Sequence, residues 1–204
     1  ECDILAVSGG WSPVVHLWSH CGGKLSWDNQ KAMFVPNLEL PPCSDDGKSF
    51  VFPVGGALGS FSTQSCLESA ISIAVTVCKL QGLKVKQLKS PKISEIEEDK
   101  IKPVWLIPEG AGSKLKASSF VDYQNDVKAS DIKQAVSEGY QSVEHAKRYT
   151  TLGMATDQGK LSNINGLAML SHHLGEPIHE VGTTTFRPPY TPISLGAIAG
   201  DARG

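Results

Sequence analysis

Hydrogen-bond donors gather in one short stretch, residues 143–163, which reads VEHAKRYTTLGMATDQGKLSN. One expected helix ends near Gly153 and the next begins near Ser162, which leaves a glycine-bounded loop between them. Its hydroxyl, amide and ammonium groups suit a phosphate or the edge of a flavin ring, because they donate directed hydrogen bonds without redox chemistry of their own. The alternative is a turn whose polar groups only cap the two helices. The polar residues of the loop are Thr150, Thr151, Thr156, Asp157, Gln158 and Lys160.

Two glycine-rich turns form the second candidate site. Each follows an expected strand, and a helix follows the second, so that bare backbone N–H groups and a positive helix end could meet a pyrophosphate. The second turn reads GGxxG rather than the complete GxGxxG pattern, which leaves a tight packing turn as the alternative. The candidates for contact with a nucleotide are Gly9, Gly10, Gly55, Gly56 and Gly59.

The cysteines and histidines indicate no metal site. Five cysteines, an odd number without CxxC spacing, argue against a disulfide framework and against zinc, so we expect free thiols. His16 and His20 are four residues apart and could share a helix face, but no third ligand stands at the spacing that a metal needs.

Composition bounds the class of protein. The chain has 204 residues, 40% of them hydrophobic and 20% charged, with a formal net charge of -2. Such a chain can bury a sizeable core, and its charge gives little support to a nucleic-acid or membrane-surface role. Apolar runs such as ISIAVTV are too short to span a bilayer, so we expect a cytoplasmic protein. The chain does not begin with Met, and it enters directly on an apolar run, as a fragment would.

The first third of the chain is expected to hold strands followed by one long helix. The nearly continuous apolar run at 2–7 is typical of a buried parallel strand. Further strands are expected at 33–37 and 49–56, separated by a turn rich in proline, aspartate and glycine. Apolar residues then recur at helical spacing over 62–80, and Gly82 follows as a stop.

The rest of the chain is expected to be a connector, a small helical unit and an extended tail. From 83 to about 119 the charges alternate and prolines interrupt, which predicts an extended connector with one strand at 103–108. The tail, 181–200, is extended by its prolines. The three short helices are expected at 131–138, 143–152 and 163–174, with Ser130, Ser142 and Ser162 as N-caps and Gly139, Gly153 and Gly175 as ends.

Residues 120–170 and 180–200 resemble the α subunit of bacterial heterotetrameric sarcosine oxidase, and 2–19 resembles the last part of its dinucleotide-binding domain. The resemblance implies an α/β fold: the C-terminal part of a FAD/NAD(P)-binding domain followed by a small all-α domain. It implies four segments: 1–82 from the NAD-binding domain, 83–116 as a connector, 117–180 as the helical domain, and 181–204 as the entry to a folate-binding, aminomethyltransferase-like domain.

The helical unit is also similar to the [2Fe-2S] domain of the bacterioferritin-associated ferredoxin type, whose pattern ends in KRRTRAGMGPCQGRFC. The stretch KRYTTLGMATDQGKLS keeps its framework, but Asp157 stands where that domain has a cysteine. No cysteine occurs after Cys78, so the unit cannot bind the cluster through four thiolates. The resemblance therefore implies a scaffold that has lost its metal.

The activity implied by the resemblance is oxidative demethylation of sarcosine to glycine, with formaldehyde or methylene-tetrahydrofolate and hydrogen peroxide as the other products. FAD belongs to the β subunit, FMN to the α/β boundary and tetrahydrofolate to the missing domain, with β, γ and δ subunits as partners. This chain would supply no catalytic residue, and the isolated fragment is expected to be inactive. It would help to bind NAD through the glycines and to position FMN through Arg148, Thr150, Thr151, Thr156, Gln158 and Lys160.

Two alternatives stay open. The chain could belong to a related glycine or opine oxidase, although those relatives commonly keep the cysteines and lack the folate-domain entry. It could also be a non-catalytic module that docks other subunits and contacts no cofactor. The discriminating feature is whether the 150–160 loop lies against a flavin or only against protein.

Overall fold

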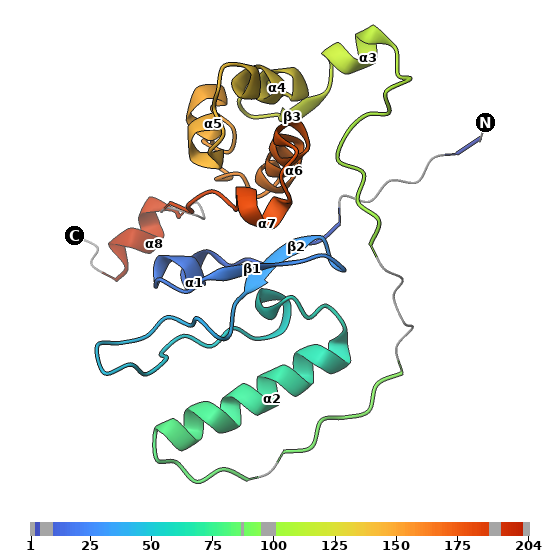
Figure 1. Cartoon of the computed structure of the whole chain (residues 1–204). Coiled ribbons are helices and arrows are strands. Elements are labelled where there is room, and N and C mark those ends of the chain that lie inside the picture. The colour runs from blue at the N-terminus through green and yellow to red at the C-terminus, as the bar shows by residue number, and fades with distance from the viewer. Residues whose placement is uncertain (1–2, 5–9, 87, 95–100, 188–192, 202–204) are drawn as a thin grey trace. The chain divides into compact units, whose positions relative to one another are not determined.

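The structure is a computed structural model that describes residues 3–4, 10–86, 88–94, 101–187 and 193–201 (Figure 1). The chain divides into two compact units, 1–101 and 102–204, and each is described by itself. Within the described residues the fold mixes α and β structure, with mostly helices and two antiparallel two-stranded sheets. The strand expected at 2–7 lies largely outside the described residues. In the described part of the chain, no helix combines the length and apolar character needed to cross a membrane.

The first unit begins with a short helix and a hairpin. Helix α1 (His16–His20) is followed by β1 (Leu25–Asp28) and β2 (Met33–Pro36), which pair with Leu25 opposite Pro36. Strand β2 confirms the expected strand at 33–37, whereas β1 was not expected. The residues of β1, LSWD, alternate between apolar and polar as in a strand, although all four are half-buried in the structure.

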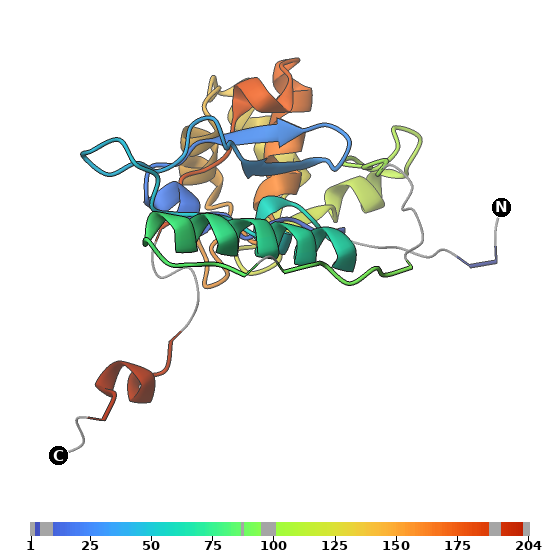
Figure 2. The same ribbon diagram turned by 90° about the horizontal axis from the view of Figure 1, so that it is seen from below.

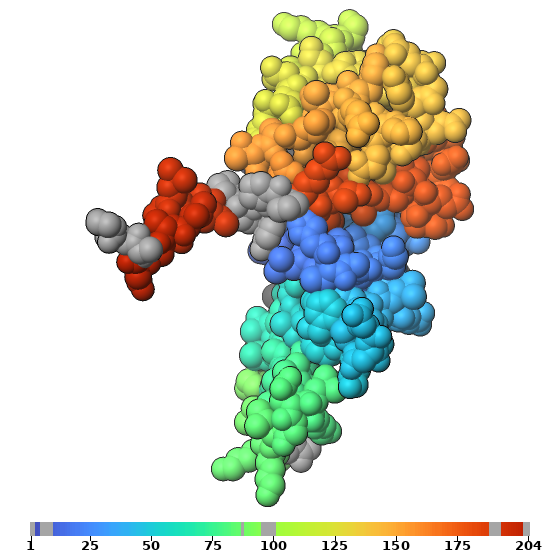
Figure 3. Space-filling model, turned by 90° about the vertical axis from the view of Figure 1, so that its left-hand side faces the viewer, coloured from blue at the N-terminus to red at the C-terminus, as the bar shows by residue number. Residues whose placement is uncertain are grey.

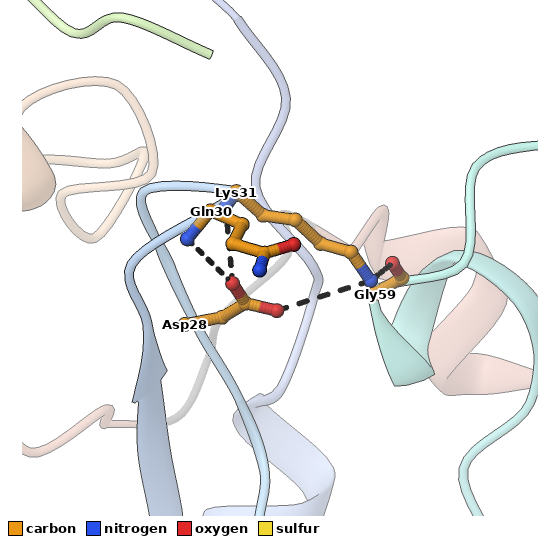
Figure 4. Close-up of polar contacts among 4 residues, drawn as sticks. All are labelled: Asp28, Gln30, Lys31 and Gly59. Carbon is orange, nitrogen blue, oxygen red and sulfur yellow. Dashed lines mark hydrogen bonds and ion pairs between the residues drawn. The ribbon is translucent and has the colours of Figure 1, made fainter. Parts of the chain in front are cut away.

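The turn between β1 and β2 contacts a later segment of the same unit, at Gly59 (Figure 4). Asp28 Oδ1 accepts hydrogen bonds from the backbone N–H groups of Gln30 (2.8 Å) and Lys31 (3.0 Å). Lys31 Nζ lies 4.0 Å from Asp28 Oδ2 and donates to the Gly59 carbonyl at 2.7 Å. The turn therefore fixes the 3-10 helix η1 (Gly55–Leu58) and the glycine that follows it.

The prediction of a strand at 49–56 is wrong. Ser49 forms an isolated bridge with Cys43, and residues 50–54 form no strand. Pro53 has no N–H to donate to a ladder, and Gly55 has a φ of 56°, which leaves the extended region. Phe50 is 54% exposed, so the apolar run that suggested a strand does not bury its largest side chain.

Helix α2 (Thr63–Leu80) confirms the long helix expected at 62–80. Ser62 is its N-cap, because Ser62 Oγ accepts from the Ser65 N–H at 3.1 Å. Gly82, just beyond its end, has a φ of 69°. No residue of α2 is buried. The chain then turns back beside the helix (Figure 1 and Figure 2), where the Gln64 amide donates to Ser90 Oγ at 3.2 Å and accepts from Ile93 N–H at 3.1 Å.

Replacing Ser62 by alanine is expected to lower the free energy of unfolding by about 1 kcal/mol, because one N–H of the first turn of α2 loses its acceptor. Urea unfolding of the chain, followed by far-UV circular dichroism, measures the loss. Ser72→Ala, at an exposed site inside the same helix, is the matched control and should be neutral or slightly stabilising. Equal effects of the two substitutions would contradict a capping role for Ser62.

The second unit combines a small hairpin with a bundle of helices. Helix α3 (Ser113–Ala117) precedes β3 (Phe120–Asp122) and β4 (Val127–Lys128), which pair antiparallel. Three helices confirm the three that were expected: α4 (Ala129–Ser137), α5 (Val143–Thr150) and α6 (Asn163–Leu174). Two short helices follow, α7 (Ile178–Val181) and α8 (Leu195–Ala199).

Several details of the second unit correct the expectations. The strand expected at 103–108 is absent from the described residues, since proline at each end removes a donor and no partner strand lies beside it. Helix α8 interrupts the tail that was expected to be extended over 181–200, and α7 ends at the first residue of that tail. Ser130 is not the cap of α4, because the helix starts at Ala129, two residues earlier than expected, and Lys128 is its N-cap residue. Asp131 Oδ2 accepts from the Lys128 N–H at 2.8 Å. Ser142 and Ser162 stand at N-cap positions but accept no capping bond.

The core of the second unit lies among α4, α5 and α6. Ile132 and Ala135 on α4, Ala146 on α5 and Leu167 on α6 are all at most 4% exposed. Gly166 on α6 allows a close approach, because a Cβ there would lie 2.3 Å from Leu152 Cδ2. Leu152 belongs to the loop between α5 and α6, so the same packing that forms the core also anchors that loop.

Candidate functional site

The loop between α5 and α6, residues 151–162, packs against the β3–β4 turn, residues 122–126 (Figure 1). The Gly153 N–H donates to Asp122 Oδ2 at 2.8 Å, and the Asn125 amide donates to the Thr151 carbonyl at 2.9 Å. The Asp157 N–H donates to Gln124 Oε1 at 3.3 Å. Segments about 30 positions apart in the chain therefore form one polar unit. Hydrogen bonds from the β3–β4 turn stabilise the conformation of the loop.

Asp122 is the centre of this polar unit. It is only 3% exposed, and a buried carboxylate is stable only when hydrogen bonds replace its water. Oδ1 accepts from the N–H groups of Gln124 (2.9 Å) and Asn125 (3.2 Å), and Oδ2 accepts from Gly153 N–H (2.8 Å) and Ser162 Oγ (3.4 Å). Four donors thus surround the Asp122 carboxylate.

A second buried side chain, Asn163, fills the inside of the loop. Gly153 and Gly159 have φ values of 66° and 74°, and a Cβ on either would lie 2.1 Å from Asn163 Oδ1. Asn163 is 7% exposed, and its Nδ2 donates to Thr184 Oγ1 at 2.8 Å. Its Oδ1 is enclosed and has no hydrogen-bond partner among the described residues. Both positions therefore require glycine, because the Asn163 carboxamide occupies the space that a Cβ would need.

Two of the residues expected at a flavin, Thr150 and Gln158, make side-chain hydrogen bonds that shape the turn. Thr150 Oγ1 donates to the Ala146 carbonyl at 2.8 Å and accepts from Leu152 N–H at 3.2 Å. Gln158 Nε2 donates to the Ala155 carbonyl at 3.0 Å. For these two side chains the structure favours the alternative, in which polar groups stabilise the turn itself.

The other four expected residues, Arg148, Thr151, Thr156 and Lys160, have exposed side chains. Thr156 and Lys160 lie on the same short turn, on either side of Asp157 and Gln158. The Asp157 carboxylate closes this turn, because it accepts from the N–H groups of Gly159 (3.2 Å) and Leu161 (3.3 Å). A rigid turn that presents a hydroxyl and an ammonium group at the surface can bind an external acceptor.

The sequence reasoning missed the buried half of the site. Ser162 aligns with the last cysteine of the pattern KRRTRAGMGPCQGRFC, so the alignment that singled out Asp157 could also have found it. Asp122 and Gln124 lie 35 and 33 positions before Asp157, and no local pattern pointed to them. Within the described residues, no group of three or more His, Cys, Asp or Glu side chains is placed to hold a metal.

The glycines expected at a nucleotide lie in the first unit, apart from Gly9, which is outside the described residues. Gly55 N–H donates to Ser69 Oγ at 3.1 Å, and Gly59 N–H donates to the Gly56 carbonyl at 3.1 Å. Gly59 also has a packing role, since a Cβ there would lie 2.8 Å from Val35 Cγ1. Gly10 has a φ of 72° and is exposed. The N–H groups of Gly55 and Gly59, as arranged here, are already used within the chain.

Comparison with known proteins agrees with the resemblance found in the sequence. Residues 116–202 match the family described as the sarcosine oxidase A3 domain. The chain is 43% identical over 203 residues to sarcosine oxidase subunit alpha of Rhizobium meliloti (strain 1021), covering 99% of this chain and 19% of that one. It is 38% identical over 207 residues to the same subunit of Corynebacterium sp. (strain P-1), covering 100% of this chain and 20% of that one. The chain thus spans about one fifth of the length of the curated relatives it matches.

A solved structure shares the fold. The crystal structure of L-proline dehydrogenase from P. horikoshii superposes with a TM-score of 0.60 and 19% sequence identity, covering 93% of this chain and 37% of that chain. At this identity the likeness shows the fold alone. The family follows from the sequence matches: the chain is a segment of the sarcosine oxidase alpha-subunit family, with an A3 domain at residues 116–202.

Proposed function

We propose that this chain works as part of a sarcosine oxidase, which oxidatively demethylates sarcosine to glycine and yields hydrogen peroxide with formaldehyde or methylene-tetrahydrofolate. The observation that carries the proposal is the 43% identity to an alpha subunit over 99% of the chain. In the proposal, 1–82 belongs to a NAD-binding domain, 83–116 connects, 117–180 is the helical domain and 181–204 leads to a folate-binding domain. FAD in the β subunit and the β, γ and δ subunits complete the enzyme.

The activity is tested in the complete complex. The full alpha subunit that contains this chain is produced together with its partner subunits, and hydrogen peroxide formation is measured with sarcosine, glycine and an opine as substrates. We expect turnover with sarcosine, with formaldehyde released when tetrahydrofolate is absent. Preference for glycine or an opine would instead assign the chain to one of the related oxidases.

Within that enzyme, we propose that the exposed edge of the 151–162 loop holds FMN at the boundary with the β subunit. Thr156 and Lys160 would donate to the flavin, with Thr151 beside them, and Arg148 would pair with its phosphate. The support is the rigid, donor-bearing turn described above, and Thr150 and Gln158 shape that turn rather than contact the cofactor. When bound, FMN supplies the electron-transfer chemistry, and the residues of this chain only bind and orient it.

Replacing both Thr156 and Lys160 by alanine in the complete complex is expected to weaken FMN binding about tenfold, since a loss of about 1.4 kcal/mol corresponds to that factor. Bound FMN per complex and the rate of electron transfer between the flavins are the measurements. The matched control is Ser130→Ala with Lys133→Ala, a hydroxyl and an ammonium group that are exposed on α4. Full FMN content in the Thr156/Lys160 variant would refute the proposed contact.

The proposed contact with NAD involves fewer of the glycines than the sequence suggested. Since the N–H groups of Gly55 and Gly59 are already used, these two glycines do not fit a pyrophosphate in the present arrangement. The remaining candidates for contact with NAD are Gly9, Gly10 and Gly56. Equilibrium dialysis of this chain against NAD is expected to show weak binding or none, and micromolar affinity would contradict that expectation.

A second function, docking of another subunit without cofactor contact, is favoured by one observation. Apolar side chains near the loop are exposed: Tyr123 by 78%, Met154 by 47% and Leu161 by 75%. Exposed apolar groups beside a rigid turn suit a protein partner. Loss of subunit assembly in a Leu161→Ser variant, with normal FMN content in the Thr156/Lys160 variant, would support docking alone.

A further inference from the structure

We infer that α5 and the segment 182–187 form a binding site for a phosphate-class oxyanion, with Lys147 and Arg187 as its cations. The site differs from the exposed edge of the loop to which FMN was assigned, and it does not depend on that assignment. Its evidence is a buried lysine without a hydrogen bond or ion pair within the described residues, a second cation within electrostatic reach of it, and too little negative charge to balance the two.

Lys147 lies on the buried face of α5. It is only 6% exposed, and it shares this face with Val143 and Ala146. Within the described residues its ammonium group makes no hydrogen bond and no ion pair. It is also not among the fully enclosed side-chain polar atoms of the described chain that lack a hydrogen bond, so the tip of the side chain reaches the surface. A small anion from solution can therefore contact Nζ.

The segment 182–187 is held against α5 and α6 by two contacts. Thr185 N–H donates to Glu144 Oε1 on α5, and Asn163 Nδ2 on α6 donates to Thr184 Oγ1. In the space-filling view (Figure 3), the red atoms of this part of the chain lie against the orange atoms of the helical unit. Arg187 follows Thr185 by two residues, and its positive charge is close enough to act on Lys147 in the middle of α5.

The charges around Lys147 are unbalanced. Desolvation lowers the pKa of Lys147, the nearby Glu144 carboxylate raises it, and the positive charge of Arg187 lowers it further. Glu144 is more than 4.0 Å from the ammonium group, and its Oε1 already accepts from the segment. Two cations thus face one carboxylate that is partly engaged.

A phosphate group matches this arrangement. Its oxygens accept from both an ammonium and a guanidinium group, and its charge offsets the cost of burying a lysine without a partner. Inorganic phosphate and the phosphate of a mononucleotide share this chemistry, and the experiment distinguishes them.

The test is thermal unfolding of the full chain in a zwitterionic buffer, with increasing inorganic phosphate or with sodium chloride at equal ionic strength. At phosphate ten times the Kd, the unfolding temperature should rise by about 3–6 °C relative to the chloride series. Lys147→Met should raise the unfolding temperature without phosphate, because the buried charge is gone, and should abolish the response to phosphate. Lys147→Arg should retain the response, and Lys133→Met on α4 is the control that changes neither.

Phosphorus-31 NMR with inorganic phosphate, and with FMN or a simple phosphate monoester, identifies the source of the group. Tighter binding of FMN that is lost in Lys147→Met indicates a mononucleotide at this site, and equal binding of all three that is lost in the same variant indicates free phosphate; both outcomes support the site. A response to phosphate that is unchanged in Lys147→Met and Arg187→Met, or no response in the original chain, would overturn it. The flavin proposal is judged separately, by FMN content in the Thr156/Lys160 variant.

Discussion

Gly159→Ala should lower the free energy of unfolding of the helical unit by about 3 kcal/mol. Two costs add together. A non-glycine residue at a φ of 74° is disfavoured by about 1 kcal/mol, and the new Cβ would stand 2.1 to 2.3 Å from three atoms of the Asn163 carboxamide. Asn163 cannot move away freely, because it is buried and bonded to Thr184. Urea unfolding, followed by far-UV circular dichroism, measures the loss.

Gly139→Ala separates the two costs. Gly139 ends α4 with a φ of 94°, and nothing lies within 4 Å of a Cβ built there. This substitution carries only the backbone cost of about 1 kcal/mol. The difference of about 2 kcal/mol between the two variants therefore measures the close approach of Asn163. If the two variants lose equal stability, Asn163 does not occupy the space between the loop glycines.

Gly153 and Gly159 also show how far the sequence predicted the fold. Helices α2, α4, α5 and α6 follow from apolar spacing and from glycines at their ends, which are local signals. The strands expected at 49–56 and 103–108 failed because an apolar run does not reveal whether a partner strand exists. The close approach of Asn163 to both glycines was not predictable, since it depends on how α6 returns over its own loop.

The candidate site also has one part that the sequence predicted and one part that it did not. The exposed donors Thr156 and Lys160 were predictable from residue type, because a loop bounded by glycines and rich in donors is visible in the sequence. Thr150 and Gln158 are polar donors of the same loop, but their side chains bond to their own helix and turn, which only coordinates reveal. Asp122 was not predicted at all, since its four donors come from two segments about 30 residues apart.

Asp122→Asn is expected to lower the free energy of unfolding by about 3 kcal/mol. The carboxylate accepts from four groups, and an amide in its place has one acceptor oxygen and one NH₂ donor. With the oxygen kept on the Gln124 side, the NH₂ group would face the Gly153 N–H and the Ser162 hydroxyl. The buried Gly153 N–H then lacks an acceptor, in addition to the loss of the charge-assisted bonds.

Asp126→Asn is the matched control for this change. Asp126 lies in the same turn, is exposed, and has a φ of 54°, which asparagine also tolerates. Its effect on stability should stay within about 0.5 kcal/mol. Hydrogen exchange of the Gly153 amide gives a local readout: protection should fall in Asp122→Asn and persist in Asp126→Asn. Persistent protection of Gly153 in Asp122→Asn would contradict the hydrogen bond, whereas its loss would show that the buried Asp122 carboxylate anchors the 151–162 loop at Gly153.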